Sequence, residues 1–271
     1  MLITVLSDNN GTEQLPGEWG LSILIEYGGH VILLDAGASG LLMQNADRLG
    51  KDLSRVDIAV LSHAHYDHAD GFVPLLRAYP ALKVYVRRCA GADCYARKKS
   101  GLKYIGADPA LFAEFEDRLI RVDGDCCIAN GVWLIPHALP DRSALGLREQ
   151  MFRQTGETLT PDDFSHEQSL VFDTEKGLCI FNSCSHGGAA EIVREVCRVF
   201  PLRRVYAYVG GFHLYQKTPE AVERFAEALA GAGVEKIITG HCTGEAAFAI
   251  LKTRLGERIT QFSTGLEMEL I

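Results

Sequence analysis

The chain has 271 residues, of which 47% are hydrophobic and 23% are charged, and its formal net charge is -8. This composition is typical of a folded globular protein and excludes a disordered chain. The negative charge argues against a protein that binds nucleic acid through clustered positive charge, and we expect a single domain over residues 1–271.

The first residues, MLITVLSDNN, lack the basic and apolar segments of a signal peptide. No apolar stretch in the chain approaches the roughly 18 residues that a membrane-spanning helix requires. We therefore expect a cytoplasmic protein without membrane contact. The eight cysteines should then stay reduced, and we expect most of them to be small core residues.

Strands and one helix are predicted in the first quarter of the chain. Apolar runs rich in β-branched residues predict strands at 3–6, 21–26, 31–35 and 56–62. Helical periodicity at 41–49 predicts a helix between the last two strands. We expect the Ser39 hydroxyl to accept from a free N–H of its first turn, and Gly50 to end it.

Residues 88–165 show little regular periodicity, whereas the remainder of the chain is again strongly patterned. Two strands, at 169–173 and 178–182, flank a polar connection of hairpin length that ends in Gly177. Helices are then predicted at 189–199, 219–230 and 245–255, with strands at 204–209 and 236–239 between them. Such alternation of helices and strands predicts a layered α/β protein.

The segment with the clearest chemistry is Ser62-His63-Ala64-His65-Tyr66-Asp67-His68-Ala69-Asp70-Gly71. Imidazole and carboxylate groups are ligands that zinc, iron and manganese accept. On an extended chain His63 and His65 point the same way and can reach one metal ion. In a following helical turn, Asp67 and His68 would project towards a second ion about 3.5 to 4 Å away. A chance cluster of surface histidines is the weaker interpretation.

These residues match the H-x-H-x-D-H signature of the metallo-β-lactamase superfamily without a gap, so the sequence resembles that superfamily. The resemblance extends to Leu33-Leu34-Asp35-Ala36-Gly37, whose Asp supports the metal loop, and to a final ligand, His241. It implies an α/β fold, the αββα sandwich of two mixed sheets with outer helices and metal ions at one edge. The implied metal ligands are His63, His65, Asp67, His68, His186 and His241.

The sequence departs from the common superfamily pattern after the predicted strand at 178–182. Many members carry a metal-bridging Asp there, whereas this chain has Cys184 and then His186. We interpret His186 as the third nitrogen ligand of the first metal ion. Cys184 is either a thiolate ligand or a small buried residue, and we favour burial because free cysteines are so often buried.

The other histidines differ in what their surroundings indicate. His213 lies in a Gly-Gly-Phe-His loop, where it could bind substrate or act as a general acid, or could only hydrogen-bond its own loop. The remaining three, His30, His137 and His166, have no pattern that raises them above structural or surface roles.

Further blocks resemble one branch of the superfamily, which includes a pterin-dependent synthase. Among these blocks are Ser7-Asp8-Asn9, Glu167-Gln168-Ser169-Leu170 and Gly240-His241-Cys242-Thr243-Gly244. The branch resemblance implies a transferase that joins a pterin diphosphate to an aryl ribosyl phosphate with loss of diphosphate.

The superfamily resemblance favours a metal-dependent hydrolase. Two divalent metal ions, zinc by preference with iron or manganese as alternatives, would make water nucleophilic near pH 7. The substrate would be a phosphorylated or other anionic small molecule, with Asp67 and His213 as catalytic residues. The rivals are the transferase, a non-catalytic metal-binding scaffold, and an iron-dependent oxidoreductase, although no flavin-binding segment follows.

A basic stretch in the less regular region bears on the substrate. It comprises Arg87, Arg88, Arg97, Lys98, Lys99 and Lys103. These side chains could meet an anionic substrate, but charge runs usually only cover a solvated surface. We favour the solvated surface.

Overall fold

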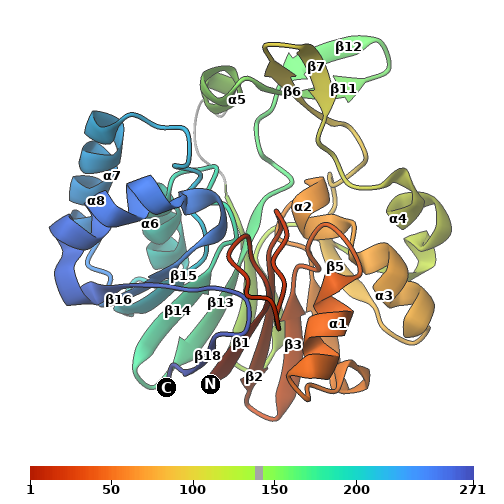
Figure 1. Ribbon diagram of the computed structural model, residues 1–271, viewed down its shortest axis with the longest axis horizontal. Coiled ribbons are helices and arrows are strands. Elements are labelled where there is room, and N and C mark those ends of the chain that lie inside the picture. The colour runs from red at the N-terminus through yellow and green to blue at the C-terminus, as the bar shows by residue number, and fades with distance from the viewer. Residues whose placement is uncertain (138–142) are drawn as a thin grey trace.

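The computed structural model describes residues 1–137 and 143–271. Within these residues, two seven-stranded sheets lie face to face, and helices cover both outer faces (Figure 1). This arrangement confirms the predicted αββα sandwich. Both termini lie at one edge of the sandwich, where the Met1 ammonium donates a hydrogen bond to the Ile271 carbonyl over 2.6 Å.

The first sheet takes most of its strands from the N-terminal half of the chain. Its order is β18 (Glu267–Glu269), β1 (Leu2–Ser7), β2 (Ser22–Tyr27), β3 (His30–Leu34), β4 (Ile58–Val60), β5 (Val84–Arg87) and β8 (Leu119–Val122). Along β2, Ile23 and Ile25 pack between the two sheets, whereas Leu24 packs beneath the helices. Successive side chains of a strand point to opposite faces, so this strand contributes to two apolar layers.

The second sheet is formed largely by the C-terminal half. Its order is β17 (Ile259–Gln261), β16 (Lys236–Thr239), β15 (Val205–Val209), β14 (Gly177–Phe181), β13 (Gln168–Thr174), β10 (Val132–Pro136) and β9 (Cys126–Ala129). The predicted hairpin is present as β13 and β14, which pair antiparallel from Leu170 and Phe181 to Thr174 and Gly177. From β14 to β17 the pairing is parallel, so their carboxyl ends share one edge.

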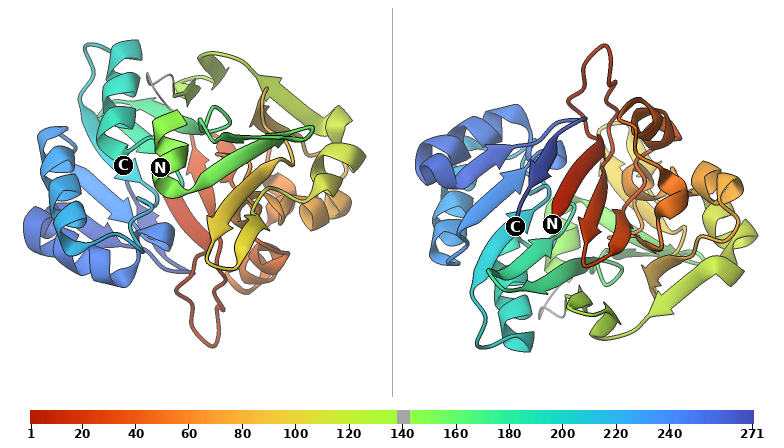
Figure 2. Two further views of the ribbon diagram at one scale, coloured as in Figure 1. Left: turned by 90° about the horizontal axis from the view of Figure 1, so that it is seen from above. Right: turned by 90° about the horizontal axis from the view of Figure 1, so that it is seen from below.

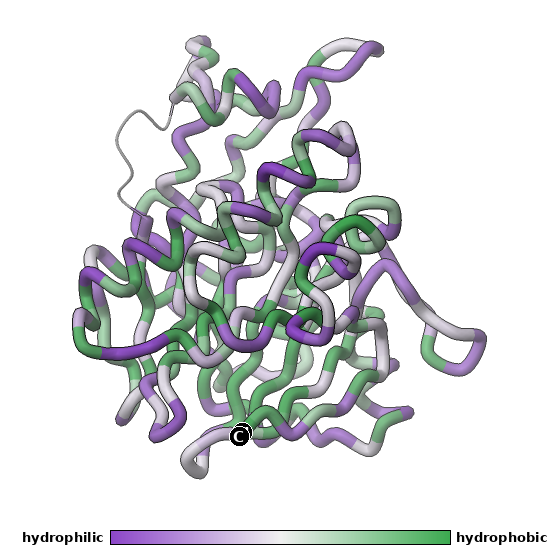
Figure 3. The backbone as a smooth tube through the Cα atoms, turned by 90° about the vertical axis from the view of Figure 1, so that its left-hand side faces the viewer, coloured by the Kyte–Doolittle hydropathy of each residue, from purple (hydrophilic) through white to green (hydrophobic). Residues whose placement is uncertain are grey.

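Helices bury one apolar face against each sheet. On the first sheet lie α1 (Leu41–Arg48), α3 (Phe72–Ala78) and α4 (Pro109–Glu114), and on the second lie α6 (Ala189–Val199), α7 (Pro219–Gly231) and α8 (Glu245–Leu255). Hydrophobic segments accordingly concentrate inside the sandwich (Figure 3). Among the described helices, none combines the length and the apolar character that crossing a membrane requires.

Two local predictions differ from the structure. The strand predicted at 56–62 is limited to β4. Its predicted first residue, Val56, instead caps the 3-10 turn Leu53–Arg55. Ser39 accepts from the N–H of Leu41 over 3.1 Å as expected, although Gly40 occupies the capping position. Gly50 ends the helix with a positive φ of 67°, a conformation that glycine adopts without steric cost.

The region predicted to be less regular contains a separate four-stranded sheet. Its order is β12 (Thr158–Pro161), β11 (Met151–Thr155), β6 (Cys94–Lys98) and β7 (Gly101–Tyr104). We call this sheet the arm. It lies with the short helix α5 (Ser143–Glu149) beyond the sandwich edge opposite the termini (Figures 1 and 2).

Candidate metal centre

The predicted ligands come together at the sandwich edge that faces the arm. This edge receives the carboxyl ends of parallel strands from both sheets. Asp35 follows β3, residues 62–65 follow β4, His186 follows β14, His213 follows β15 and His241 follows β16. Asp67 and His68 lie in the single-turn helix α2 (Tyr66–Ala69).

His63, His65 and His186 form the first group of possible ligands. All three side chains are buried, and each offers a ring nitrogen within 4.8 Å of those of the others. The Nε2 atoms of His63 and His65 and both ring nitrogens of His186 have no hydrogen-bond partner among the described residues. Because a buried polar atom without a partner is unfavourable, this group suits a metal ion. Phe164 stacks on His186 with ring centroids 4.5 Å apart and fixes that ring.

Asp67, His68 and His241 form the second group. The Nε2 atoms of His68 and His241 are 3.2 Å apart, and Asp67 Oδ2 lies 3.9 Å and 3.6 Å from them, respectively. Cys184 faces the same point, because its Sγ is 3.2 Å from His68 Nε2. Cys184 is thus buried, as we expected, but within the set of donor atoms, where a thiolate could bind the second ion.

Hydrogen bonds on the far side of the rings orient the histidines of both groups. Asp35 Oδ2 lies 2.8 Å from His68 Nδ1 and also accepts from the Ser62 hydroxyl over 2.6 Å. The same hydroxyl is 2.8 Å from His63 Nδ1. Asn9 Oδ1 lies 2.9 Å from Nδ1 of the last histidine, His241. With Nδ1–H donating outward, each Nε2 lone pair faces the site, as in metal-binding histidines generally.

Burial controls the protonation of most of these histidines. It lowers the pKa of His63, His65 and His186 far below the ordinary imidazole value, and neighbouring histidines lower it further. Burial likewise lowers the pKa of His241 to about 3. These rings are neutral at pH 7, as metal ligands must be. For His68, burial is outweighed by the adjacent carboxylates, which raise its pKa to about 8.

Backbone strain is concentrated in the loops that carry the site. Of six non-glycine residues with positive φ in the described chain, four lie here, with φ of 58° at Asp35, 54° at Ser185, 50° at His213 and 50° at His241. Such conformations cost on the order of 1–3 kcal/mol each and persist where other contacts enforce them. One such contact is the bond from the His241 N–H to Asp8 Oδ1, over 2.8 Å.

A cavity of about 270 Å³ opens between the metal centre and the arm. Its lining includes the aromatic side chains Trp19, Tyr66 and Tyr215, and the lysines Lys98 and Lys103. Neither lysine forms an ion pair within the part of the chain that the structure describes. Both lysines are exposed, as we expected of a solvated basic surface, and the arm also places them in the lining of the cavity.

His213 lies beside the first group, with its ring centroid 4.6 Å from that of His186. Its Nδ1 is buried without a partner among the described residues, and its N–H donates to Cys242 Sγ over 3.2 Å. The preceding glycines allow close packing, because a Cβ at Gly210 would lie 1.9 Å from the Asn182 carbonyl oxygen. His213 therefore faces the cavity from a tightly packed loop.

The other histidines lie outside the ligand groups. His30 pairs with Asp57 at the surface over 2.7 Å. His137 is buried between Glu195 and Ser169, at 3.0 Å from each. His166 is buried next to the metal loop, where its Nδ1 accepts from the Ala64 N–H over 3.0 Å. The sequence did not assign roles to the cavity aromatics, because nothing in their local pattern distinguishes them from packing residues.

Comparison with known proteins adds a family and a set of relatives. The family model described as "Metallo-beta-lactamase superfamily" matches residues 19–166. Two proteins of the archaeon Methanocaldococcus jannaschii are similar in sequence. One, named 7,8-dihydropterin-6-methyl-4-(beta-D-ribofuranosyl)-aminobenzene-5'-phosphate synthase, is 25% identical over 83% of this chain and 81% of its own length. The other, an uncharacterized protein, is 26% identical over 90% of this chain and 91% of its own length.

Solved structures share the fold over the whole chain. Tm1679, described as a metal-dependent hydrolase of the beta-lactamase superfamily, has a TM-score of 0.81 and 29% identity, covering 99% of this chain and 98% of its own. Zinc-bound PqqB from Methylobacterium extorquens has a TM-score of 0.59 and 11% identity, covering 99% and 100% of the two chains. The second likeness concerns the fold alone.

Proposed function

Because the chain belongs to the metallo-β-lactamase superfamily, we propose that it is a metal-dependent hydrolase acting on a phosphorylated or otherwise anionic small molecule. The observation that carries this proposal is the convergence of buried, neutral imidazole nitrogens that lack partners among the described residues. Ser62 contacts the opposite nitrogen of His63, and Asp35 and Asn9 contact the Nδ1 atoms of the second-group histidines, His68 and His241.

Two divalent metal ions fit this set of donors. His63, His65 and His186 would hold the first, and Asp67, His68 and His241 the second, with Cys184 as an additional ligand. Nitrogen and sulfur donors together favour zinc over manganese, with iron as the alternative. Metal ions bound there would lower the pKa of water and polarise a phosphoryl or carbonyl oxygen.

The chain's own residues would position the substrate and move its protons. Asp67 would orient the attacking water, and His213 would donate a proton to the leaving group from the adjacent loop. The ammonium groups of Lys98 and Lys103, which line the cavity, would bind the anionic part of the substrate. The aromatic side chains Trp19 and Tyr215 would contact its apolar part, since they form one wall with ring centroids 4.9 Å apart.

A zinc-loaded crystal structure and a metal analysis would test the metal centre. We expect two ions per chain, with nitrogen and oxygen ligands at about 2.0 to 2.2 Å. Hydrolysis of bis(p-nitrophenyl) phosphate by the loaded protein would test the reaction class. Ions bound elsewhere, with these side chains remaining apart from them, would refute the proposed centre.

Transfer is the second candidate, because a sequence relative is named as a synthase. In that reaction the same centre would stabilise a departing diphosphate while a pterin is joined to an aryl ribosyl phosphate. Incubation with a pterin diphosphate, with and without the aryl ribosyl phosphate acceptor, would separate the two. Product formation that requires the acceptor would support transfer, whereas acceptor-independent cleavage would support hydrolysis.

A further inference from the structure

Three consecutive residues, His166, Glu167 and Gln168, contact the backbone of both loops that carry the first ligand group. Gln168 donates from its N–H to the Ser62 carbonyl over 2.9 Å and from Nε2 to the Leu61 carbonyl over 2.8 Å. All three side chains are buried. Gln168 begins β13 and the other two directly precede it, next to the two ligand groups described above.

His166 contacts the loop between two ligands. Its Nδ1 accepts from the N–H of Ala64, which separates His63 from His65. An imidazole nitrogen that accepts carries no proton, so with this bond formed the ring proton lies on Nε2. The bond therefore restrains the backbone at the residue that sets the spacing of the two ligands.

Glu167 contacts the loop that follows β14, the ligand-bearing loop of the second sheet. Its Oε1 accepts from the His186 N–H over 2.9 Å, and its Oε2 accepts from the Gly187 N–H over 3.2 Å. A carboxylate that accepts two backbone N–H groups gives strong, directional bonds in a buried setting. Adjacent side chains thus restrain the backbone of ligands contributed by different sheets.

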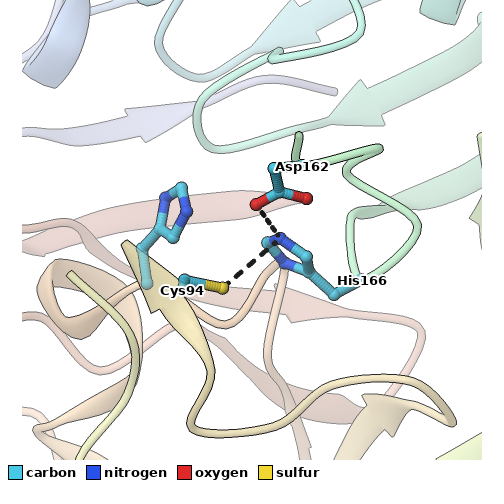
Figure 4. A group of neighbouring side chains, drawn as sticks. Cys94, Asp162 and His166 are labelled. Atoms are coloured by element: carbon cyan, nitrogen blue, oxygen red, sulfur yellow. Dashed lines mark hydrogen bonds and ion pairs between the residues drawn. The ribbon is translucent and has the colours of Figure 1, made fainter. Parts of the chain in front are cut away.

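The donor atoms of His65, Cys94, Asp162 and His166 lie within 4.8 Å of one another, but the contacts of the His166 ring argue against a nucleophile or a further metal ion there. Asp162 Oδ2, at 3.2 Å, and Cys94 Sγ, at 3.7 Å, both face Nε2, as Figure 4 shows. In a nucleophilic triad the carboxylate and the nucleophile contact opposite nitrogens, which is not the case here. A metal ion at Nε2 would require Nδ1 to donate, whereas Nδ1 accepts from Ala64.

We propose that His166 and Glu167 are positioning residues that set the backbone of the first metal's three histidine ligands. This inference rests on the proposed metal centre. Asp162 and Cys94 hold the His166 ring in the orientation that presents Nδ1 to Ala64. Because Cys94 begins β6 and Lys98 ends it, the arm that carries the substrate-binding lysines is anchored to the metal loop.

Paired substitutions at His166 test this role. In His166→Asn the side-chain oxygen can occupy the place of Nδ1 and accept from Ala64. In His166→Gln the amide instead reaches the place of Nε2, and the acceptor is lost. We expect His166→Gln to weaken binding of the first zinc ion by about 10- to 100-fold, the usual effect of losing an outer hydrogen bond, and His166→Asn to restore most of that affinity.

Glu167→Gln provides a second measurement. The amide NH2 cannot accept, so one of the two bonds to the His186 loop is lost, and we expect about a tenfold loss in affinity for the first zinc ion. Zinc affinity would be measured by competition with a chromophoric chelator, and folding by circular dichroism. His30→Asn is the matched control, since His30 also faces an aspartate but lies at the surface, and it should bind zinc like the unaltered protein.

His63→Ala distinguishes failure of this inference from failure of the proposed function. If His63→Ala loses the first ion while His166→Gln and Glu167→Gln bind it normally, the positioning role is refuted and the metal centre stands. Equal losses in His166→Asn and His166→Gln would also refute the specific role of Nδ1. If His63→Ala keeps both ions, the metal centre itself is refuted.

Discussion

The metal centre and the arm lie on opposite sides of one cavity but are built differently. In the metal centre the donor side chains are buried, and hydrogen bonds from neighbouring residues orient them. In the arm, the strand β7 is exposed along its whole length, and Lys98 and Lys103 reach the cavity without ion-pair partners among the described residues. Rigid, pre-oriented groups suit chemistry, whereas exposed, flexible cations suit recognition of a charged group.

This contrast indicates a division of roles within the proposed enzyme. Changes in the metal centre should affect turnover or metal binding, and changes in the arm should mainly affect substrate affinity. The two regions meet at the contacts of Cys94 and Asp162 with His166, among other places. The following predictions test the division, from the largest effect to the smallest.

Replacement of Asp67 by Ala should abolish measurable turnover, because this carboxylate is proposed both to bind the second ion and to orient water. The fold should be retained, since Asp67 lies in a loop helix at the sandwich edge and outside the apolar clusters. Turnover and circular dichroism would be measured on the same preparation. Turnover at the unaltered rate would remove Asp67 from the mechanism.

Replacement of His213 by Ala should lower kcat by about 10² to 10⁴ without changing the metal content, if His213 is the general acid. The loss should shrink for substrates with good leaving groups, which need little protonation. A series of aryl phosphate esters would reveal this trend. An equal loss for all leaving groups would indicate that His213 binds substrate, and no loss would indicate a structural role. Loss of metal would show that His213 is a ligand.

The two metal ions should respond differently to pH. Between pH 8 and 6 the imidazoles of the first group are already neutral, so the first ion's affinity should change little. His68, with a pKa of about 8, holds a proton that the second ion must displace. Displacement of this proton alone should make the affinity for the second ion fall by about tenfold per pH unit as pH decreases below 8, and by about 100-fold if the Cys184 thiol also loses its proton on binding.

Zinc titrations against a chelator at pH 6, 7 and 8 would measure both affinities. Equal pH dependence at the two positions would contradict the difference in protonation between His68 and the first group.

Replacement of Lys98 or Lys103 by Ala should raise KM by about five- to tenfold and leave kcat nearly unchanged, because an exposed cation contributes only modestly to binding an anion. Lys99→Ala is the matched control, since Lys99 is exposed on the same hairpin but does not line the cavity. Steady-state kinetics on an anionic substrate would measure this. A change in kcat as large as that at His213 would show that the arm takes part in the chemistry.

Local patterns predicted much of the sandwich. Strands β1, β2, β3 and β13 to β16 and the four longest helices, α1, α6, α7 and α8, follow from periodicity wherever one face is buried.

 Helix α3 was not predicted, because its seven residues are too few to show a clear helical period. The run from His63 to His68 indicated candidate metal ligands directly, since they are adjacent in the sequence there.

The arm was not predicted, for a physical reason. Its strand β7 is exposed throughout, and β12 alternates between exposed and half-buried residues over only four positions, so neither is long or apolar enough to be predicted from its pattern. The basic stretch was likewise ambiguous, because charge alone does not indicate which side chains turn over a cavity. Only the pairing of β6 with β7 and β11 brings Lys98 and Lys103 above the site.

The sequence by itself determined the family, the layered fold and the residues able to bind metal, because each of these depends on short-range spacing and residue type. Tertiary structure alone decided which groups surround those ligands. Ala64 and His166 are 102 positions apart, and Asn9 and His241 are 232 apart. Hydrogen bonds over such separations exist only once two sheets have packed together, since the packing of apolar faces brings their loops to one edge.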